Sequence, residues 1–156
     1  MARAPALQAG GRGFDSHQLH HGSSSADTRM TTDRDALNRA LLAGLRTACL
    51  VLPGVEERIN HGMPTFAVVR RTSFCNLHHH HEDDRPTLWF KAAPGVQAEL
   101  VDQEPDRFFV PPYVGPRGWL GMRLDVDLDW DEVAAVVEDA WRLVATKRQL
   151  AERDRP

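Results

Sequence analysis

The sequence predicts an α+β protein, a two-layer sandwich in which an antiparallel sheet carries its helices on one face. Two observations lead to this class. Apolar residues recur every three or four positions in segments 32–52 and 129–148, as they do in amphipathic helices. Between these segments lie short runs rich in β-branched and aromatic residues, and their short connecting loops favour antiparallel pairing. The expected order is a helix, three or four strands, a helix, one or two strands and a final helix.

Length and composition favour one globular domain. The chain has 156 residues, 42% of them hydrophobic, which is enough for a single modest core. Proteins that bind nucleic acid usually carry an excess of basic residues, so a net charge of −3 and a pI near 6.2 argue weakly against that function. They still leave room for a local basic face. Cys49 and Cys75 are the only cysteines, which predicts reduced thiols. No apolar run approaches the roughly 20 residues of a membrane span, so we expect a cytoplasmic, non-membrane protein.

The chain divides into a tail at 1–30, a domain at 31–150 and a charged end at 151–156 that we expect to fray. The tail is rich in glycine and serine and has no apolar period, so disorder is expected. Its GFDS stretch at 13–16 matches the translation of the conserved arm of a transfer RNA gene. We therefore hypothesise that Met30 is the initiator. The alternative is an ordinary flexible tail, and both predict no structure before Met30.

The first helix should begin at Thr32 or Asp33, since either can cap it. Its apolar stripe consists of Leu37, Leu41, Leu45, Ala48 and Leu52. Pro53-Gly54 cannot continue the helix, so it should end near Leu52.

A meander of four strands is expected at residues 56–60, 65–70, 73–77 and 87–91. His61-Gly62 forms the first turn and Arg71-Thr72 the second, while the polar loop 78–84 precedes the fourth strand.

The second half of the chain begins with a shorter helix after Gly95, with Val96, Leu100 and Val101 as its buried side. An aromatic, proline-rich and glycine-rich loop at 108–118 then turns the chain and feeds a strand at 119–124. Asp129 caps the last helix, with Glu132 three residues later at the spacing of a capping box.

Four segments resemble the MmcQ/YjbR family: LPGVEERINHGMPTF (52–66), LWFKAAPG (88–95), FFVPPYVGPRGWLGMRLD (108–125) and AWRLVATKR (140–148). The combination of HG-x-P-TF with PPYVG-x-x-GW is the specific part, and the resemblance covers roughly residues 35–149. It implies a small α+β fold of the type shared with secretion chaperones. It also implies a DNA-binding protein with a winged, hairpin-based motif.

For a DNA-binding function, the phosphate contacts would come from Arg70, Arg71, Lys91 and Arg117. Arg70 and Arg71 lie at a hairpin turn, where wing residues reach a phosphate backbone. Arg117 lies in the aromatic loop, and a cation beside aromatic rings is a common way to hold single-stranded bases. DNA is therefore the first partner to test.

The alternative is a domain that binds a small molecule or a protein in an aromatic groove formed by His61, Phe108, Tyr113 and Trp119. Each of these residues also has a structural interpretation. Tyr113 and Trp119 could be core residues with a polar end, and His61 could fix its own turn by a backbone hydrogen bond. The sequence leaves the ligand and the oligomeric state open.

A third hypothesis is a metal site in the histidine run His78, His79, His80 and His81. Alternate histidines of an extended segment share a face, so two imidazoles could bind zinc, with Glu82, Asp83 or Cys75 completing the set. The alternative is a solvated hairpin tip. No glycine-rich phosphate loop, Ser-His-Asp set, paired CxxC or HExxH motif occurs, so we expect no enzymatic activity and no cofactor.

Overall fold

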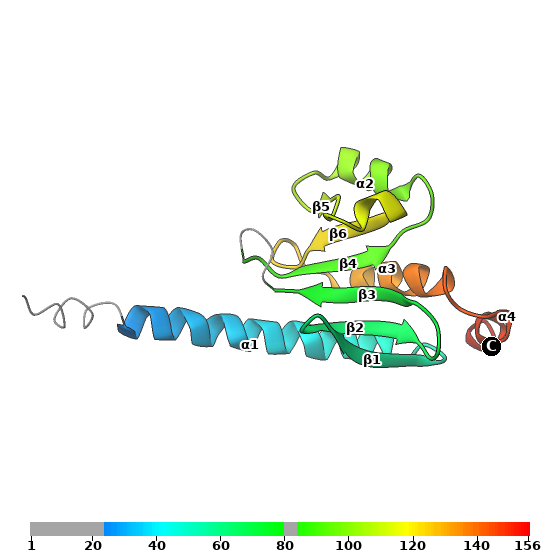
Figure 1. Ribbon diagram of the computed structural model, residues 1–156, viewed down its shortest axis with the longest axis horizontal. Coiled ribbons are helices and arrows are strands. Elements are labelled where there is room, and N and C mark those ends of the chain that lie inside the picture. Colours follow the sequence, from blue (N-terminus) through cyan, green and yellow to red (C-terminus); the bar gives the residue numbers. More distant parts are fainter. Residues whose placement is uncertain (1–23, 80–83) are drawn as a thin grey trace, which may run out of the picture. The chain divides into compact units, whose positions relative to one another are not determined.

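The computed structural model describes residues 24–79 and 84–156 and confirms the α+β class with an antiparallel sheet (Figure 1). Its elements are α1 (Ser24–Cys49), β1 (Val55–Asn60), β2 (Met63–Val68), β3 (Ser73–His78), β4 (Thr87–Lys91), α2 (Val96–Gln103), β5 (Phe108–Phe109), the 3-10 turn η2 (Gly115–Arg117), β6 (Trp119–Arg123), α3 (Trp130–Arg142) and α4 (Lys147–Arg153). The sheet order is β1-β2-β3-β4-β6-β5, and every neighbouring pair is antiparallel.

Helix α1 begins at Ser24, earlier than the expected cap, and crosses the boundary between two compact units, residues 1–36 and 37–156. Residues 24–30, which we expected in the tail, are therefore helical. The rest of the tail, including the GFDS stretch, lies outside the described residues. None of the described helices is both long enough and apolar enough to cross a membrane.

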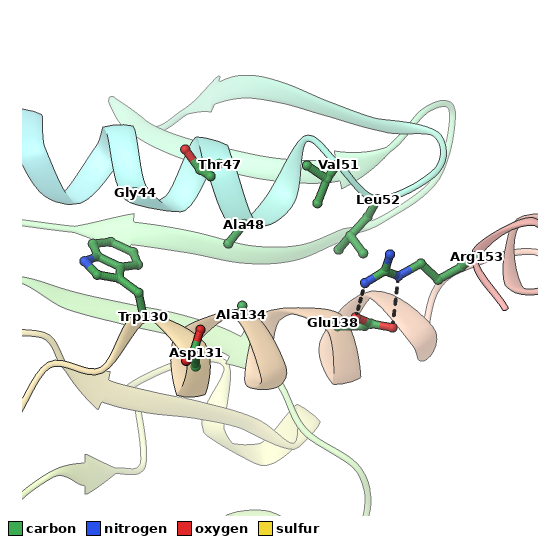
Figure 2. Close-up of a pocket in the computed structure, with 10 residues that line it drawn as sticks. All are labelled: Gly44, Thr47, Ala48, Val51, Leu52, Trp130, Asp131, Ala134, Glu138 and Arg153. Atoms are coloured by element: carbon green, nitrogen blue, oxygen red, sulfur yellow. Dashed lines mark hydrogen bonds and ion pairs between the residues drawn. The ribbon is translucent and has the colours of Figure 1, made fainter. Parts of the chain in front are cut away.

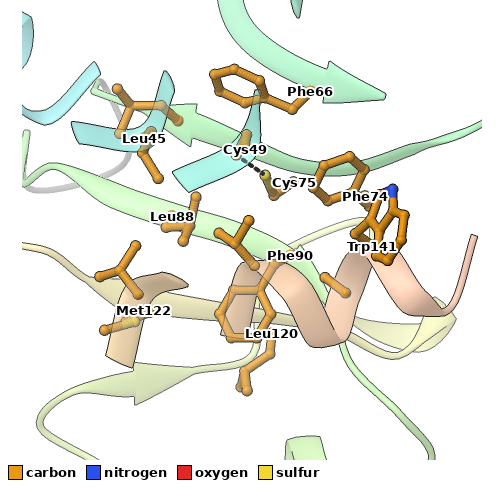
Figure 3. Packing of buried hydrophobic residues seen from close by; sticks show 14 of the residues in the cluster. Leu45, Cys49, Phe66, Phe74, Cys75, Leu88, Phe90, Leu120, Met122 and Trp141 are labelled. Carbon is orange, nitrogen blue, oxygen red and sulfur yellow. Dashed lines mark hydrogen bonds between the residues drawn. The ribbon is translucent and has the colours of Figure 1, made fainter. Parts of the chain in front are cut away.

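The core lies between the sheet and two helices, α3 and the part of α1 after Leu37 (Figure 3). Alternation along the strands places one row of side chains in it, since Phe66, Cys75, Phe90 and Leu120 are cross-strand partners on β2, β3, β4 and β6. All four are at most 3% exposed. This strand face is therefore the covered face of the sheet.

Two contacts join distant segments within the core. The Sγ atoms of Cys49 on α1 and Cys75 on β3 lie 3.7 Å apart, and both residues are free thiols with no exposed surface. Burial, followed by the hydrogen bond with Cys49, raises the pKa of the Cys75 thiol well above its usual range. The indole Nε1 of Trp141 donates to the carbonyl of Pro53 at 3.1 Å, which ties α3 to the turn after α1.

Part of the C-terminal segment 151–156, which we expected to fray, is helical. Residues 151–153 belong to α4, which Thr146 opens with a capping box completed by Gln149. Ion pairs connect α4 to α3, because Arg153 bonds Glu138 at 2.8 Å and Arg142 bonds Asp154 at 2.7 Å. A second helix thus follows α3, and the expected order lacked it.

Candidate functional site

The face of the sheet opposite α3 and the part of α1 after Leu37, here called the open face, displays the other half of the alternating side chains. One row crosses the sheet through Thr65, Asn76, Trp89, Gly121 and Phe109. A Cβ atom at Gly121 would lie 2.3 Å from Cζ of Phe109, so only glycine leaves room for that ring over β6. The open face is therefore built around aromatic side chains.

A pocket of about 850 Å³ lies on the open face. Its walls come from the β1–β2 turn, from β3 and β4 and from the loop between β5 and β6. The lining residues are Asn60, His61, Gly62, Met63, Thr72, Ser73, Asn76, His78, Trp89, Lys91, Pro112, Tyr113, Val114, Arg117 and Trp119. We call this cavity the sheet-face pocket.

The loop from 110 to 118 forms one wall, and hydrogen bonds hold it in place. The side-chain Nε2 of Gln97 donates to the carbonyl oxygens of Gly115 at 2.9 Å and Trp119 at 2.6 Å. Gly118, with φ at 84°, ends η2 in the left-handed region that favours glycine. Tyr113 also has a positive φ, 66°, and is 92% exposed. The loop thus presents an aromatic ring at the pocket in a costly backbone conformation.

The opposite wall is the tight turn between β1 and β2. Asn60 and Met63 are the last paired residues, so His61 and Gly62 form a two-residue loop. Both have positive φ values, 51° and 79°, as the favoured hairpin turns require. This turn directs the exposed His61 to the pocket.

The floor of the pocket is polar and aromatic. The rings of His78 and Trp89 stack with centroids 3.6 Å apart, and the indole Nε1 of Trp89 donates to the Thr87 hydroxyl at 3.2 Å. Asn76 lies beside Trp89 on the neighbouring strand. Its Oδ1 atom is buried and accepts no hydrogen bond from the described residues. Buried acceptors usually have a donor, so this amide is suited to meet one on a ligand.

The charged side chains that line the pocket are positive among the described residues. Lys91 and Arg117 line it, and no carboxylate does so among the described residues. Many other arginines pair with carboxylates away from the pocket, as in Arg46–Glu57, Arg58–Glu56, Arg85–Asp125, Arg107–Glu132, Arg142–Glu138 and Arg153–Glu138. The hydrogen bond from Arg85 is the main reason that the pKa of Asp125 is lowered. The sheet-face pocket is therefore locally basic in a protein of net negative charge.

A sequence model of the YjbR family matches residues 50–143, a span that contains the whole lining of this pocket. The chain belongs to the YjbR family. The crystal structure of the Deinococcus radiodurans protein DR2400, a DUF419 domain, has a similar fold, with a TM-score of 0.57 at 19% identity over 72% of this chain and 86% of that chain. At this identity the likeness shows the fold alone. No functionally curated protein is significantly similar to this chain.

The YjbR domain brings together residues that the sequence nominated for two different functions. His61, Tyr113 and Trp119, expected in the aromatic groove, share the pocket with Lys91 and Arg117, expected to contact DNA. The sequence reasoning missed Trp89 and Asn76. The two-residue period of side chains along a strand was the signal that could have placed Asn76 on the face of His78, and Trp89 on the face of Thr87 and Lys91.

Three nominated residues lie elsewhere. Phe108 is 2% exposed and pairs with Met122 on the covered face, so it belongs to the core rather than to the groove. Arg70, with φ at 62°, and Arg71 are exposed at the turn between β2 and β3. They do not line the pocket, but the next two residues, Thr72 and Ser73, do.

The described residues that were expected to bind a metal do not lie together. His78 is 8% exposed in the pocket floor, while Cys75 points to the covered face, where its thiol contacts Cys49. Cys75 therefore cannot join His78 in one metal site. His80, His81, Glu82 and Asp83 lie outside the described residues, and within the described ones no three His, Cys, Asp or Glu side chains are grouped to hold a metal.

A second cavity of about 360 Å³ lies between α1 and α3 (Figure 2). Its lining is mostly apolar, and the ring of Trp130 lies against Gly44, where a Cβ atom would come within 2.1 Å of it. The Glu138–Arg153 ion pair forms one end. Among the described residues, the one cation that lines this cavity is Arg153, which is already paired with Glu138, so the cavity is a weaker candidate than the sheet-face pocket.

Proposed function

We propose that this YjbR domain is a non-enzymatic binding protein whose ligand combines a negative charge with a planar ring and occupies the sheet-face pocket. The observation that carries the proposal is the pocket's combination of two cations, Lys91 and Arg117, with the rings of Trp89, Tyr113 and Trp119. The volume of about 850 Å³ is also within the range of about 300 to 1,000 Å³ that small-molecule pockets have.

Binding is favoured over catalysis by the chemistry of the lining. A histidine base in an acyl-transfer site is oriented by a third group, commonly a carboxylate. His61 is the exposed histidine of the pocket, and no described carboxylate lines the pocket to orient it. The lining supplies ring faces, amides and positive charge, which are groups for recognition.

The proposal is tested by titrating the protein with 8-anilinonaphthalene-1-sulfonate, which joins aromatic rings to a negative charge, and with the uncharged N-phenyl-1-naphthylamine. We expect Lys91→Ala/Arg117→Ala to weaken sulfonate binding by about tenfold and to leave binding of the neutral probe unchanged. The matched control is Lys147→Ala/Arg148→Ala, which removes one exposed lysine and one exposed arginine outside the pocket. Equal losses in the two double variants would refute the proposal.

A second candidate function is binding of single-stranded nucleic acid, and the position of Arg70 and Arg71 favours it. Both are exposed and stand directly before Thr72 and Ser73 of the pocket lining. A strand with a base in the pocket would therefore pass close to two further cations, as phosphate contacts require.

The nucleic-acid candidate is tested by fluorescence anisotropy of labelled single- and double-stranded DNA over a salt series. Binding should favour the single strand, weaken steeply with salt and fall in Arg70→Ala/Arg71→Ala, because each lost phosphate contact reduces counterion release. Absence of binding at low salt would remove this candidate and leave the small ligand.

A further inference from the structure

The floor of the sheet-face pocket can discriminate between ligands. Asn76 lies on β3 between Thr65 and Trp89, and its buried Oδ1 lacks a donor among the described residues. Leaving such an oxygen unsatisfied is unfavourable, because it has lost its hydrogen bonds to water. A side-chain amide offers an acceptor and a donor side by side, so its complement is a molecule with an N–H group next to an acceptor.

The walls define the shape of that molecule. Trp119 lies across from Lys91 on the neighbouring strand. Tyr113 is exposed on a loop that is held by the two hydrogen bonds from Gln97. Aromatic rings that line a pocket bind planar rings by stacking, with little ordering cost when the loop is already fixed. The complement of Asn76 is therefore the edge of a planar heterocycle.

The cations define the other end of the ligand. Lys91 and Arg117 belong to the same lining, and neither takes part in an ion pair among the described residues. A phosphate monoester carries a charge of about −1.5 to −2 near neutral pH, which two such cations balance. A heterocycle with edge donors, joined to a phosphate, is a nucleotide.

We propose that the sheet-face pocket binds a nucleoside 5′-phosphate with adenine as the base, an inference that rests on the function proposed above. The Asn76 amide accepts from the exocyclic N6 amine and donates to N7, the pairing that asparagine makes with adenine. The ring stacks against Tyr113 or Trp119, and the phosphate binds Lys91 and Arg117. The same chemistry is present in a free nucleotide and in an unpaired residue of a nucleic-acid strand.

The test is isothermal titration of the full chain with AMP, adenosine and ribose 5-phosphate. We expect AMP to bind at least about tenfold more tightly than either fragment, because only AMP engages both ends of the pocket. Asn76→Ala should reduce AMP to the affinity of ribose 5-phosphate while sulfonate-probe binding is retained, and Asn38→Ala on α1 should change neither. Asn76→Leu, which keeps the approximate size of the side chain and removes its polar atoms without adding a charge, replaces the alanine variant if that variant does not fold.

The outcomes separate this inference from the proposed function. AMP binding no tighter than ribose 5-phosphate, with the sulfonate probe still bound, overturns the nucleotide and leaves the proposed function intact. Failure of both AMP and the sulfonate probe overturns both. If AMP binds as expected, a single-stranded oligodeoxyadenylate of about ten residues identifies the source: tighter binding than AMP assigns a nucleic-acid residue, and equal or weaker binding assigns the free nucleotide.

Discussion

The side-chain amide of Gln97 donates a hydrogen bond of 2.6 Å to the carbonyl oxygen of Trp119. The same Nε2 atom donates to the carbonyl of Gly115 at 2.9 Å. One residue of α2 thus binds the first residue of η2 and the first residue of β6, and through them it holds the loop that presents Tyr113. A loop that is ordered before binding lowers the conformational entropy that the ligand must overcome.

Replacing Gln97 by alanine should loosen this wall of the pocket. The variant removes two hydrogen bonds, although the Gly115 carbonyl oxygen still accepts from the backbone N–H of Gly118, so we expect a loss of about 1 to 2 kcal/mol in the free energy of unfolding. Binding of the sulfonate probe should weaken several-fold because the loop must then be ordered by the ligand. Urea unfolding and fluorescence titration measure the two effects. Gln103→Ala, an exposed position of the same helix, is the control and should affect neither.

The sequence predicts the fold class because the deciding signals are local. Helical periodicity in α3, strand composition in β2 to β4 and the turn at His61-Gly62 are all confirmed. The ends of the helices are predicted less well, because they depend on contacts between distant segments. Helix α1 starts at Ser24, and α4 continues to Arg153, where ion pairs with α3 stabilise a segment whose own composition suggested fraying. Those pairs are tertiary contacts, which composition does not report.

The pocket could be predicted only in part, because it depends on strand register. Phe108 and Phe109 are adjacent, so one must face the core and the other the open face. Pairing with Met122 sends Phe108 to the core, and pairing with Gly121 sends Phe109 to the open face. The sequence alone does not fix that register. For the same reason it grouped His61 and Tyr113 in one groove but could not show that Lys91 and Arg117 line the same cavity.

Gly121→Ala should destabilise the protein through Phe109. The added methyl group would meet three ring atoms at 2.3 to 2.7 Å, so the ring must leave its place over β6. Overpacking of this kind costs about 1 to 3 kcal/mol. A double-mutant cycle with Phe109→Ala measures it: the glycine substitution should cost much less once the ring is absent. Equal costs in the two backgrounds would show that the ring is not the obstacle.

The two thiols should be unreactive in the folded protein. Cys49 and Cys75 are fully buried, and the raised pKa of Cys75 keeps its reactive thiolate scarce. We expect labelling by an aromatic disulfide reagent to proceed at the rate of unfolding, with both thiols reacting at once in urea. Fast labelling of either cysteine in native buffer would contradict the packing in Figure 3.

The α3–α4 ion pairs should make stability depend on pH in acid. The hydrogen bond from Arg153, and then that from Arg142, lower the pKa of Glu138 below its ordinary value of 4.5. The unfolded chain therefore takes up this proton first, so the stabilisation is complete above pH 4.5 and is lost as the pH falls through the lower, folded-state pKa. Glu138→Gln should remove about 0.5 to 1 kcal/mol at neutral pH and flatten this part of the acid profile. Asp125→Asn, at the separate Arg85 pair, is the control that should leave the Glu138 contribution in place.

Replacing Tyr113 by glycine should raise the stability of the protein and weaken ligand binding. A left-handed conformation costs a residue with a Cβ atom about 1 to 2 kcal/mol, and glycine in its place adds about 0.5 to 1 kcal/mol of unfolded-state entropy. Because Tyr113 is 92% exposed, little packing is lost, and Tyr113→Gly should raise the free energy of unfolding by up to about 1 kcal/mol. The same change removes a ring from the pocket and should weaken sulfonate-probe binding several-fold, while Tyr113→Phe, which keeps the ring, should bind normally. A glycine variant that is more stable and still binds with full affinity would show that the strained tyrosine does not contact the ligand.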